Sequence, residues 1–234
     1  MRSSRFTFKQ FAIEQSGAAM KIGTDGVLLG AWVDVVDANR VLDIGTGTGV
    51  IALMMAQRGG AERIVGVDID QTAAQCAAEN FAASPWAERL TALHTSVQEY
   101  DGHTFDLIVS NPPYFTNSLL CPDSSRTTAR HTTSLSFEDL DNSVCRVLDR
   151  DTGRFALILP AEQMERYLTL THLNLVRRCD VYSKAGGKLV RVMAELSFVE
   201  PQSVEHQKII IYGDSGREYT EQYRGLTKDF YLKF

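Results

Sequence analysis

Four consecutive residues, Asn111-Pro112-Pro113-Tyr114, combine groups that can hold a planar amino group. Two successive prolines fix the backbone and remove two N–H donors, which leaves carbonyl oxygens free to accept hydrogen bonds. The Asn111 amide oxygen and the Pro112 carbonyl then form a pair of acceptors that matches the two donors of an NH₂ group. Tyr114 is suited to stack on a flat base. We interpret the four residues as catalytic rather than as a stiff turn with a buried tyrosine.

This pair of acceptors predicts a transfer to nitrogen. The lone pair of an aromatic amine is delocalised and weakly nucleophilic. Holding both N–H bonds favours a tetrahedral nitrogen whose lone pair points at a methyl donor, and the acceptors stabilise the positive charge that develops. Alignment with the donor adds a proximity effect. A strong general base is not required, because the cationic amine loses its proton readily.

A glycine-rich segment predicts a nucleoside cofactor. Asp43 and Ile44 lead into Gly45-Thr46-Gly47-Thr48-Gly49, where alternating glycines permit a tight turn and close approach of a ligand. Amide groups at the start of the following helix can bind polar ligand groups. Asp68 lies where an acid accepts hydrogen bonds from ribose hydroxyls. The loop does not exclude NAD as the cofactor. The NAD-binding pattern G-x-G-x-x-G/A does not match from Gly45, but it matches from Gly47, with Ala52 at its last position.

The elements that position these residues alternate between strands and helices. Apolar runs predict strands at 40–44, 63–68, 90–95, 105–110 and 154–159, and helices are predicted at 50–57, 71–83, 136–150 and 161–172. Three late extended segments, 176–182, 189–199 and 208–212, have no helices between them. We therefore expect an α/β fold with a doubly wound, mostly parallel seven-stranded sheet and an antiparallel edge hairpin. The motifs fall at carboxyl ends of strands, so they can share one crevice.

Composition restricts the function further. The 234 residues suit a single domain, and the net charge of −5 argues against loose, purely electrostatic binding of nucleic acid. The four cysteines form no C-x-x-C pair, which argues against a metal site and paired-thiol redox chemistry. No apolar run approaches the ~20 residues of a membrane span. We expect a cytoplasmic monomer without a metal.

The glycine-rich segment, Asp68 and Asn111 to Tyr114 together resemble the amino-methyltransferase group of the class I, Rossmann-like methyltransferases. The stretch Lys21 to Val27 resembles an extra N-terminal motif of that group, which packs near the methionine moiety of S-adenosylmethionine. Further stretches are similar to one bacterial family, the tRNA(Val) adenine N6-methyltransferases, which modify adenosine 37 beside the anticodon. These stretches are Lys9 to Phe11, Met20 to Trp32, Ala129 to Thr132 and Asp229 to Leu232, so the similarity covers nearly the whole chain.

The resemblance implies S-adenosylmethionine as cofactor and tRNA as substrate. It implies a single domain, 1–234, in which residues 1–39 pack by the cofactor site and residues 40–234 form the core and a C-terminal hairpin and tail. The segment 115–135 is polar and without periodicity, and we expect it to be a mobile lid that orders over RNA through Arg126, Arg130 and His131. The implied cofactor-binding residues are Thr24, Asp25, Gly26, Asp43, Gly45, Thr46, Gly47, Gly49, Asp68, Ile69, Ser96, Val97 and Asn111.

Several alternatives remain at this point. A release-factor glutamine methyltransferase shares N-P-P-Y, but such enzymes usually carry a helical domain before the glycine loop, and only about 40 residues precede Asp43 here. DNA adenine methyltransferases generally need a large recognition domain, for which the chain leaves little room. A ribosomal RNA guanine methyltransferase is disfavoured mainly by the family resemblance. The intact motifs argue against an inactive RNA-binding factor, and nothing resembles the hydride chemistry of an NAD dehydrogenase.

Overall fold

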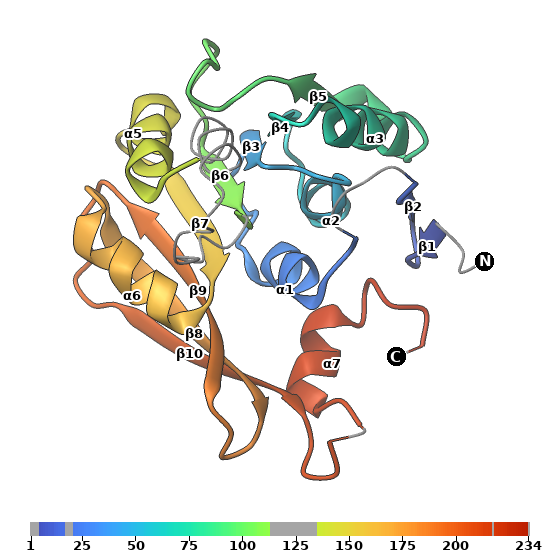
Figure 1. Ribbon diagram of the computed structural model, residues 1–234, viewed down its shortest axis with the longest axis vertical. Coiled ribbons are helices and arrows are strands. Elements are labelled where there is room, and N and C mark those ends of the chain that lie inside the picture. Colours follow the sequence, from blue (N-terminus) through green and yellow to red (C-terminus); the bar gives the residue numbers. More distant parts are fainter. Residues whose placement is uncertain (1–4, 17–20, 113–134, 217, 234) are drawn as a thin grey trace, which may run out of the picture.

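The apolar runs of the first two thirds of the chain form the parallel part of a large sheet (Figure 1). The computed structural model describes residues 5–16, 21–112, 135–216 and 218–233. Strands β3, β4, β5, β6 and β7 are all parallel, in the order β5-β4-β3-β6-β7. Their interiors are nearly continuous apolar runs because helices cover both faces of the sheet. The bounds are Arg40–Ile44 (β3), Arg63–Asp68 (β4), Leu90–His94 (β5), Leu107–Ser110 (β6) and Arg154–Leu159 (β7).

The other end of the sheet corrects one expectation. The sheet has eight strands rather than seven, and the antiparallel hairpin of β8 (Asn174–Lys184) and β9 (Leu189–Ser197) is not its edge. Strand β9 pairs antiparallel with β7, and β10 (Glu205–Tyr212) pairs parallel with the outer side of β8. Because Ile209 and Ile211 alternate with more exposed residues and are buried in the core, the last segment is held as an additional edge strand.

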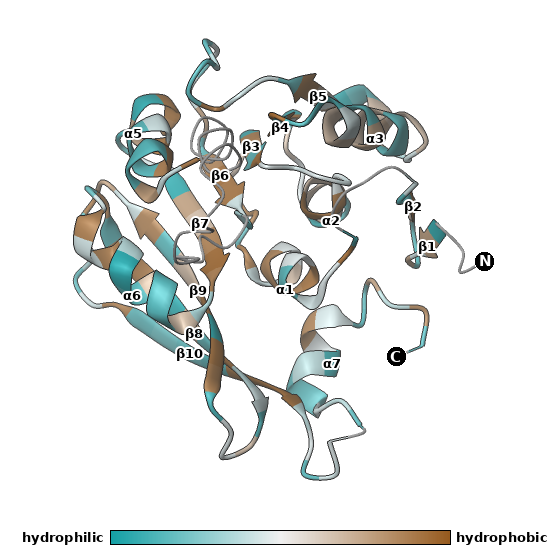
Figure 2. Ribbon diagram, in the orientation of Figure 1, coloured by the Kyte–Doolittle hydropathy of each residue, from teal (hydrophilic) through white to brown (hydrophobic). Residues whose placement is uncertain are grey.

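Helices form a layer on each face of the sheet (Figure 1). One core lies against α1 (Thr24–Trp32), α2 (Val50–Arg58), α3 (Gln71–Ala82) and α7 (Glu221–Thr227), and the other against α5 (Phe137–Val147) and α6 (Ala161–Leu170). A 3-10 turn, η1 (Ala87–Arg89), precedes β5. In Figure 2, the central strands are largely brown, whereas α5 and α6 carry teal on their outer faces.

Local signals set several helix ends where the sequence places them. Ser136 caps α5 through a reciprocal capping box with Asp139, which satisfies backbone N–H groups that the first turn leaves without partners. Gly59 ends α2, as the Gly59-Gly60 pair predicts. Helix α6 ends at Leu170, two residues before the expected end, and the chain turns there into β8.

The N-terminal segment is tied to the glycine-rich loop by one buried amide. Strands β1 (Arg5–Thr7) and β2 (Ala12–Glu14) form a two-stranded antiparallel sheet. The Asn80 side chain accepts from the Glu14 amide at 2.8 Å and donates to the Glu14 carbonyl at 3.0 Å. It also donates to the Thr48 carbonyl at 2.9 Å. Asn80 therefore fixes the β1–β2 sheet and the loop against α3 at the same time.

The same loop requires glycine at its end. Gly49 precedes α2 with a φ of +80°, in the left-handed region that L side chains rarely adopt. A Cβ at this position would lie 2.4 Å from Cε1 of Phe81, a buried α3 side chain. Backbone conformation and close packing on α3 therefore both select glycine.

We predict that Gly49→Ala lowers the free energy of unfolding by about 2 kcal/mol or more, because it combines a strained φ with overpacking against Phe81. Gly60→Ala is the matched control, since a Cβ there meets no atom within 4 Å. Urea unfolding of both variants measures the difference. Equal stabilities of the two variants would contradict the packing argument.

Candidate active site

A cavity of about 710 Å³ opens at the carboxyl ends of the central parallel strands. This is where ligands bind in open α/β sheets, because the loops that leave adjacent strands diverge there. The order β4-β3-β6 brings the glycine-rich loop between the loops that follow β4 and β6. The lining residues are 21–23, 25–26, 44–48, 50–51, 67–70, 73, 95–99 and 110–112, together with Leu135 and Arg191.

Asp68 at the end of β4 is held in place by two backbone amides. Its Oδ2 accepts from the Gly47 amide at 2.9 Å, and its Oδ1 accepts from the Asp70 amide at 2.9 Å. The carboxylate therefore links the glycine-rich loop to the start of α3. A carboxylate oxygen can accept more than one hydrogen bond, so Asp68 can also receive hydroxyl donors from a ligand in the cavity.

Asp43 lies beneath the loop and is absent from the cavity wall. It is fully buried, and its Oδ2 accepts from the Thr46 hydroxyl at 2.8 Å. Oδ1 makes no hydrogen bond of normal geometry within the described part of the chain. Burial raises the Asp43 pKa to about 7, although the Thr46 hydroxyl and the Ala52 amide oppose the rise. Asp43 thus positions the loop rather than facing a ligand.

Asn111 and Pro112 line the cavity just after β6. The Ser110 hydroxyl donates to the Ile44 carbonyl at 3.0 Å, which joins the ends of β6 and β3. A Cβ on Gly26 of α1 would lie 3.9 Å from the Asn111 Nδ2 atom. The N-terminal residues of α1 therefore pack directly against the predicted catalytic asparagine.

An ion pair between Arg191 and Asp25 forms part of the cavity wall, and the sequence did not reveal it. The Arg191 Nε atom of β9 lies 2.8 Å from the Asp25 Oδ2 atom of α1, and both residues line the cavity. The two positions are 166 residues apart. The sequence offers no signal for this pairing, because it depends on β9 running back beside β7.

Comparison with known proteins identifies the family of the chain. Residues 16–123 match the family model described as the methyltransferase small domain. The tRNA1(Val) (adenine(37)-N6)-methyltransferase of Phocaeicola vulgatus is 46% identical over 99% of both chains. The enzyme of the same name from Aeromonas hydrophila is 44% identical, again over 99% of both chains. The chain therefore belongs to the tRNA1(Val) (adenine(37)-N6)-methyltransferase family.

Distantly related methyltransferases of known structure share the fold of this methyltransferase. A predicted O-methyltransferase from Agrobacterium tumefaciens matches with a TM-score of 0.67 at 16% identity, over 88% of this chain and 96% of the other. A putative class I S-adenosylmethionine-dependent methyltransferase from Listeria monocytogenes matches with a TM-score of 0.54 at 14% identity, over 78% of this chain and 62% of the other. The class I fold and the family resemblance are both confirmed. Among the described residues, none of the helices has the length and apolar character to cross a bilayer.

Most of the predicted site residues of the methyltransferase line the cavity. Thr24, Asp43 and Gly49 are not among the lining residues: Thr24 is the exposed first residue of α1, Asp43 is fully buried and Gly49 directly precedes α2. Pro113, Tyr114, Arg126, Arg130 and His131 lie outside the described residues, as does the expected lid except Leu135. The predicted residues that line the cavity are Asp25, Gly26, Gly45, Thr46, Gly47, Asp68, Ile69, Ser96, Val97, Asn111 and Pro112.

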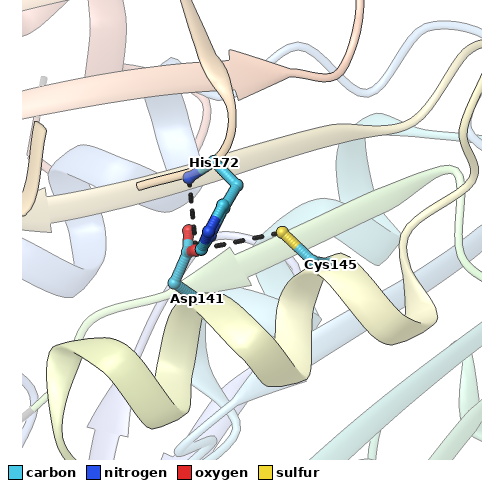
Figure 3. A group of neighbouring side chains, drawn as sticks. All are labelled: Asp141, Cys145 and His172. Atoms are coloured by element: carbon cyan, nitrogen blue, oxygen red, sulfur yellow. Dashed lines mark hydrogen bonds and ion pairs between the residues drawn. The ribbon is translucent and has the colours of Figure 1, made fainter. Parts of the chain in front are cut away.

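A second polar cluster lies apart from the cavity, where Asp141 and Cys145 of α5 face His172 (Figure 3). The buried Asp141 carboxylate accepts from the Tyr167 hydroxyl at 3.2 Å and from the Thr171 hydroxyl at 2.5 Å. It also accepts from the His172 backbone amide at 3.2 Å and lies 2.6 Å from His172 Nδ1. Burial and Asp141 raise the Cys145 pKa to about 11, which disfavours the thiolate a metal needs. These contacts make the cluster a link between α5 and the end of α6.

The raised pKa of Asp43 predicts a pH-dependent stability. The folded protein keeps a proton between about pH 4 and pH 7 that the unfolded chain has lost, so this group's contribution falls as pH rises through that range. Asp43→Asn keeps an acceptor for Thr46 and removes the buried charge. We expect its melting temperature, relative to wild type, to rise from pH 5 to about pH 7 and to level off above that.

Asp34→Asn is the control of opposite sign. Burial raises the Asp34 pKa, but the Val36 amide and Arg154 outweigh it and lower the pKa overall. This variant should lose stability relative to wild type only as pH rises toward about 4, and between pH 5 and pH 8 its difference from wild type should stay constant. A difference between Asp43→Asn and wild type that does not change with pH would show that Asp43 is ionised throughout.

Proposed function

We propose that the chain transfers a methyl group from S-adenosylmethionine to the exocyclic N6 nitrogen of adenosine 37 in tRNA1(Val), as the names of its relatives state for those enzymes. The observation that carries the proposal is that the Asp68 carboxylate, the glycine-rich loop and Asn111-Pro112 share one cavity. A cofactor held by the first two would therefore lie beside the groups that can grip an amine.

The described wall fits S-adenosylmethionine in three ways. Asp68 offers acceptors to ribose hydroxyls. The amides at the start of α2 have no side-chain cap and can bind polar groups. Ile69 and Val97 provide apolar surface for the adenine ring. When bound, the cofactor supplies an electrophilic methyl group.

Asn111 and Pro112 would act on the substrate nitrogen. The Asn111 amide oxygen and the Pro112 carbonyl accept the two N–H bonds, orient the lone pair and stabilise the developing charge. A target adenine has to leave its stack to reach the cavity, and an anticodon loop lowers this cost because its bases are already partly splayed. By sequence alone, we assign stacking on the base to Tyr114 and RNA contacts to Arg126, Arg130 and His131.

The remaining features of the proposal follow from the same substrate. We propose one domain over 1–234, in which residues 1–39 complete the cofactor side of the site and residues 40–234 carry the catalytic core. The tRNA substrate is consistent with action in the cytoplasm. A monomer without metal remains the prediction.

The reaction is tested with labelled S-adenosylmethionine and tRNA from cells that lack this modification, followed by nucleoside analysis. We expect N6-methyladenosine at position 37 of valine tRNA and no label in release factor. Label on a release-factor glutamine would contradict the substrate assignment and favour the glutamine methyltransferase alternative, which shares N-P-P-Y.

Asn111→Ala separates chemistry from cofactor binding. We expect a fall in kcat of about 100-fold or more, by analogy with removal of one hydrogen-bonding group from a transition-state site, with S-adenosylmethionine still bound. Asn142→Ala is the control, because Asn142 is exposed on α5, and it should turn over like wild type. Near wild-type turnover of Asn111→Ala would refute the assigned chemistry.

A further inference from the structure

The tip of the β8–β9 hairpin lies at the same edge of the sheet as the cavity. Leu159, the last residue of β7, pairs with Val192 of β9, and Arg191, the preceding residue, lines the cavity. The hairpin tip, residues 182–189, therefore extends beyond the carboxyl edge. At about 3.3 Å per extended residue, Lys188 lies within roughly 10 Å of Arg191 along the strand.

This tip carries exposed positive charge. Lys184 and Lys188 flank the turn, and both are exposed. The Lys208 ammonium of β10 lies 4.7 Å from the centre of the Tyr182 ring, which places a third cation beside a partly exposed aromatic ring. The protein has a net charge of −5, so this local group of cations contrasts with the charge of the whole chain.

Acidic side chains of the hairpin are already paired with arginines. Asp180 of β8 lies 2.8 Å from Arg178, which also pairs with Glu165 of α6. Asp25 of α1 pairs with Arg191. Each of these three acids is thus engaged by an arginine rather than by Lys184 or Lys188, with Arg178 shared between two carboxylates.

The turn between the lysines is small as well as basic. The Gly187 amide donates to the Lys184 carbonyl at 3.0 Å, and Gly186 has a φ of +66°. Ala185, Gly186 and Gly187 carry almost no side-chain bulk. A phosphate backbone can therefore approach the main chain closely between the two lysines.

We propose that the hairpin tip binds the sugar-phosphate backbone beside the target adenosine, with Lys184 and Lys188 as phosphate contacts. This inference rests on the proposed function and names the RNA-docking surface of its site. A span of about 10 Å corresponds to at most about three nucleotides, since stacked nucleotides advance ~3.4 Å each and splayed ones advance further. The tip is thus spaced to hold nucleotides next to the one whose base enters the cavity.

The test compares two charge-reversed double variants. Lys184→Glu/Lys188→Glu changes the tip. Arg63→Glu/Arg150→Glu makes the same change in net charge at the amino edge of the sheet, at the first residue of β4 and in the turn before β7. We expect the tip variant to raise the KM for tRNA about tenfold or more, because each lost phosphate contact weakens binding severalfold. Its S-adenosylmethionine affinity and melting temperature should match wild type, and the control should stay within about twofold of wild type for KM.

Salt dependence gives a second readout. Loss of two phosphate contacts should reduce the slope of log affinity against log salt by about 1.4, at ~0.7 per contact for single strands. The milder Lys184→Ala/Lys188→Ala variant should show the same change in slope. An unchanged KM and slope, or equal effects of the tip and control variants, would overturn the proposal.

Direct binding of tRNA to the same proteins distinguishes this inference from the proposed reaction. A wild-type chain that binds tRNA through the tip but does not methylate it would overturn the reaction and support the docking surface. A wild-type chain that methylates tRNA, with a tip variant that binds tRNA equally well, would overturn the docking surface alone. Preferential binding of a release-factor protein through the tip would also overturn it.

Discussion

The contact on which the site depends most is the pair of hydrogen bonds from the Gly47 and Asp70 amides to the Asp68 carboxylate. Gly47 belongs to the turn after β3, and Asp70 caps α3 after β4. The Gly45 and Thr46 amides, which donate to the Val67 carbonyl, and Asn80 of α3, which donates to the Thr48 carbonyl, also join these two turns. Because one carboxylate holds them, the acceptor for a ribose and the amides of the glycine-rich loop keep a fixed separation before any ligand arrives.

The rest of the fold brings the amine-binding residues to this fixed half of the site. Strand β6 lies next to β3, and the Ser110–Ile44 hydrogen bond joins their ends. Helix α1 then closes the cavity from the N-terminal side, with Gly26 against Asn111 and Asp25 paired with Arg191. Cofactor binding and catalysis are thus divided between two neighbouring strand ends.

Sequence reasoning predicted the parts of the molecule that depend on local signals. The glycine loop, Asp68 and Asn111 were found because each follows an apolar strand, and Ser136 was found because a capping box needs only residues three apart. The burial of Asp43 beneath the loop was not predicted, since strand alternation alone does not show which side chain faces the cavity. The segment 208–212 was predicted to be extended, but its place as the eighth strand and the pairing of Arg191 with Asp25 were missed because both depend on long-range contacts.

The most direct test of this account is the affinity of S-adenosylmethionine for Asp68→Ala and for Asp70→Ala, measured by titration calorimetry. Both changes remove a carboxylate from the cavity wall, but only Asp68 accepts from the loop. We predict that Asp68→Ala weakens binding by about 100-fold or more, because the two hydrogen bonds from ribose hydroxyls to a charged carboxylate are lost. Asp70→Ala should bind within about fivefold of wild type and lose about 1 kcal/mol of stability with the α3 cap. Equal affinities of Asp68→Ala and wild type would contradict the account.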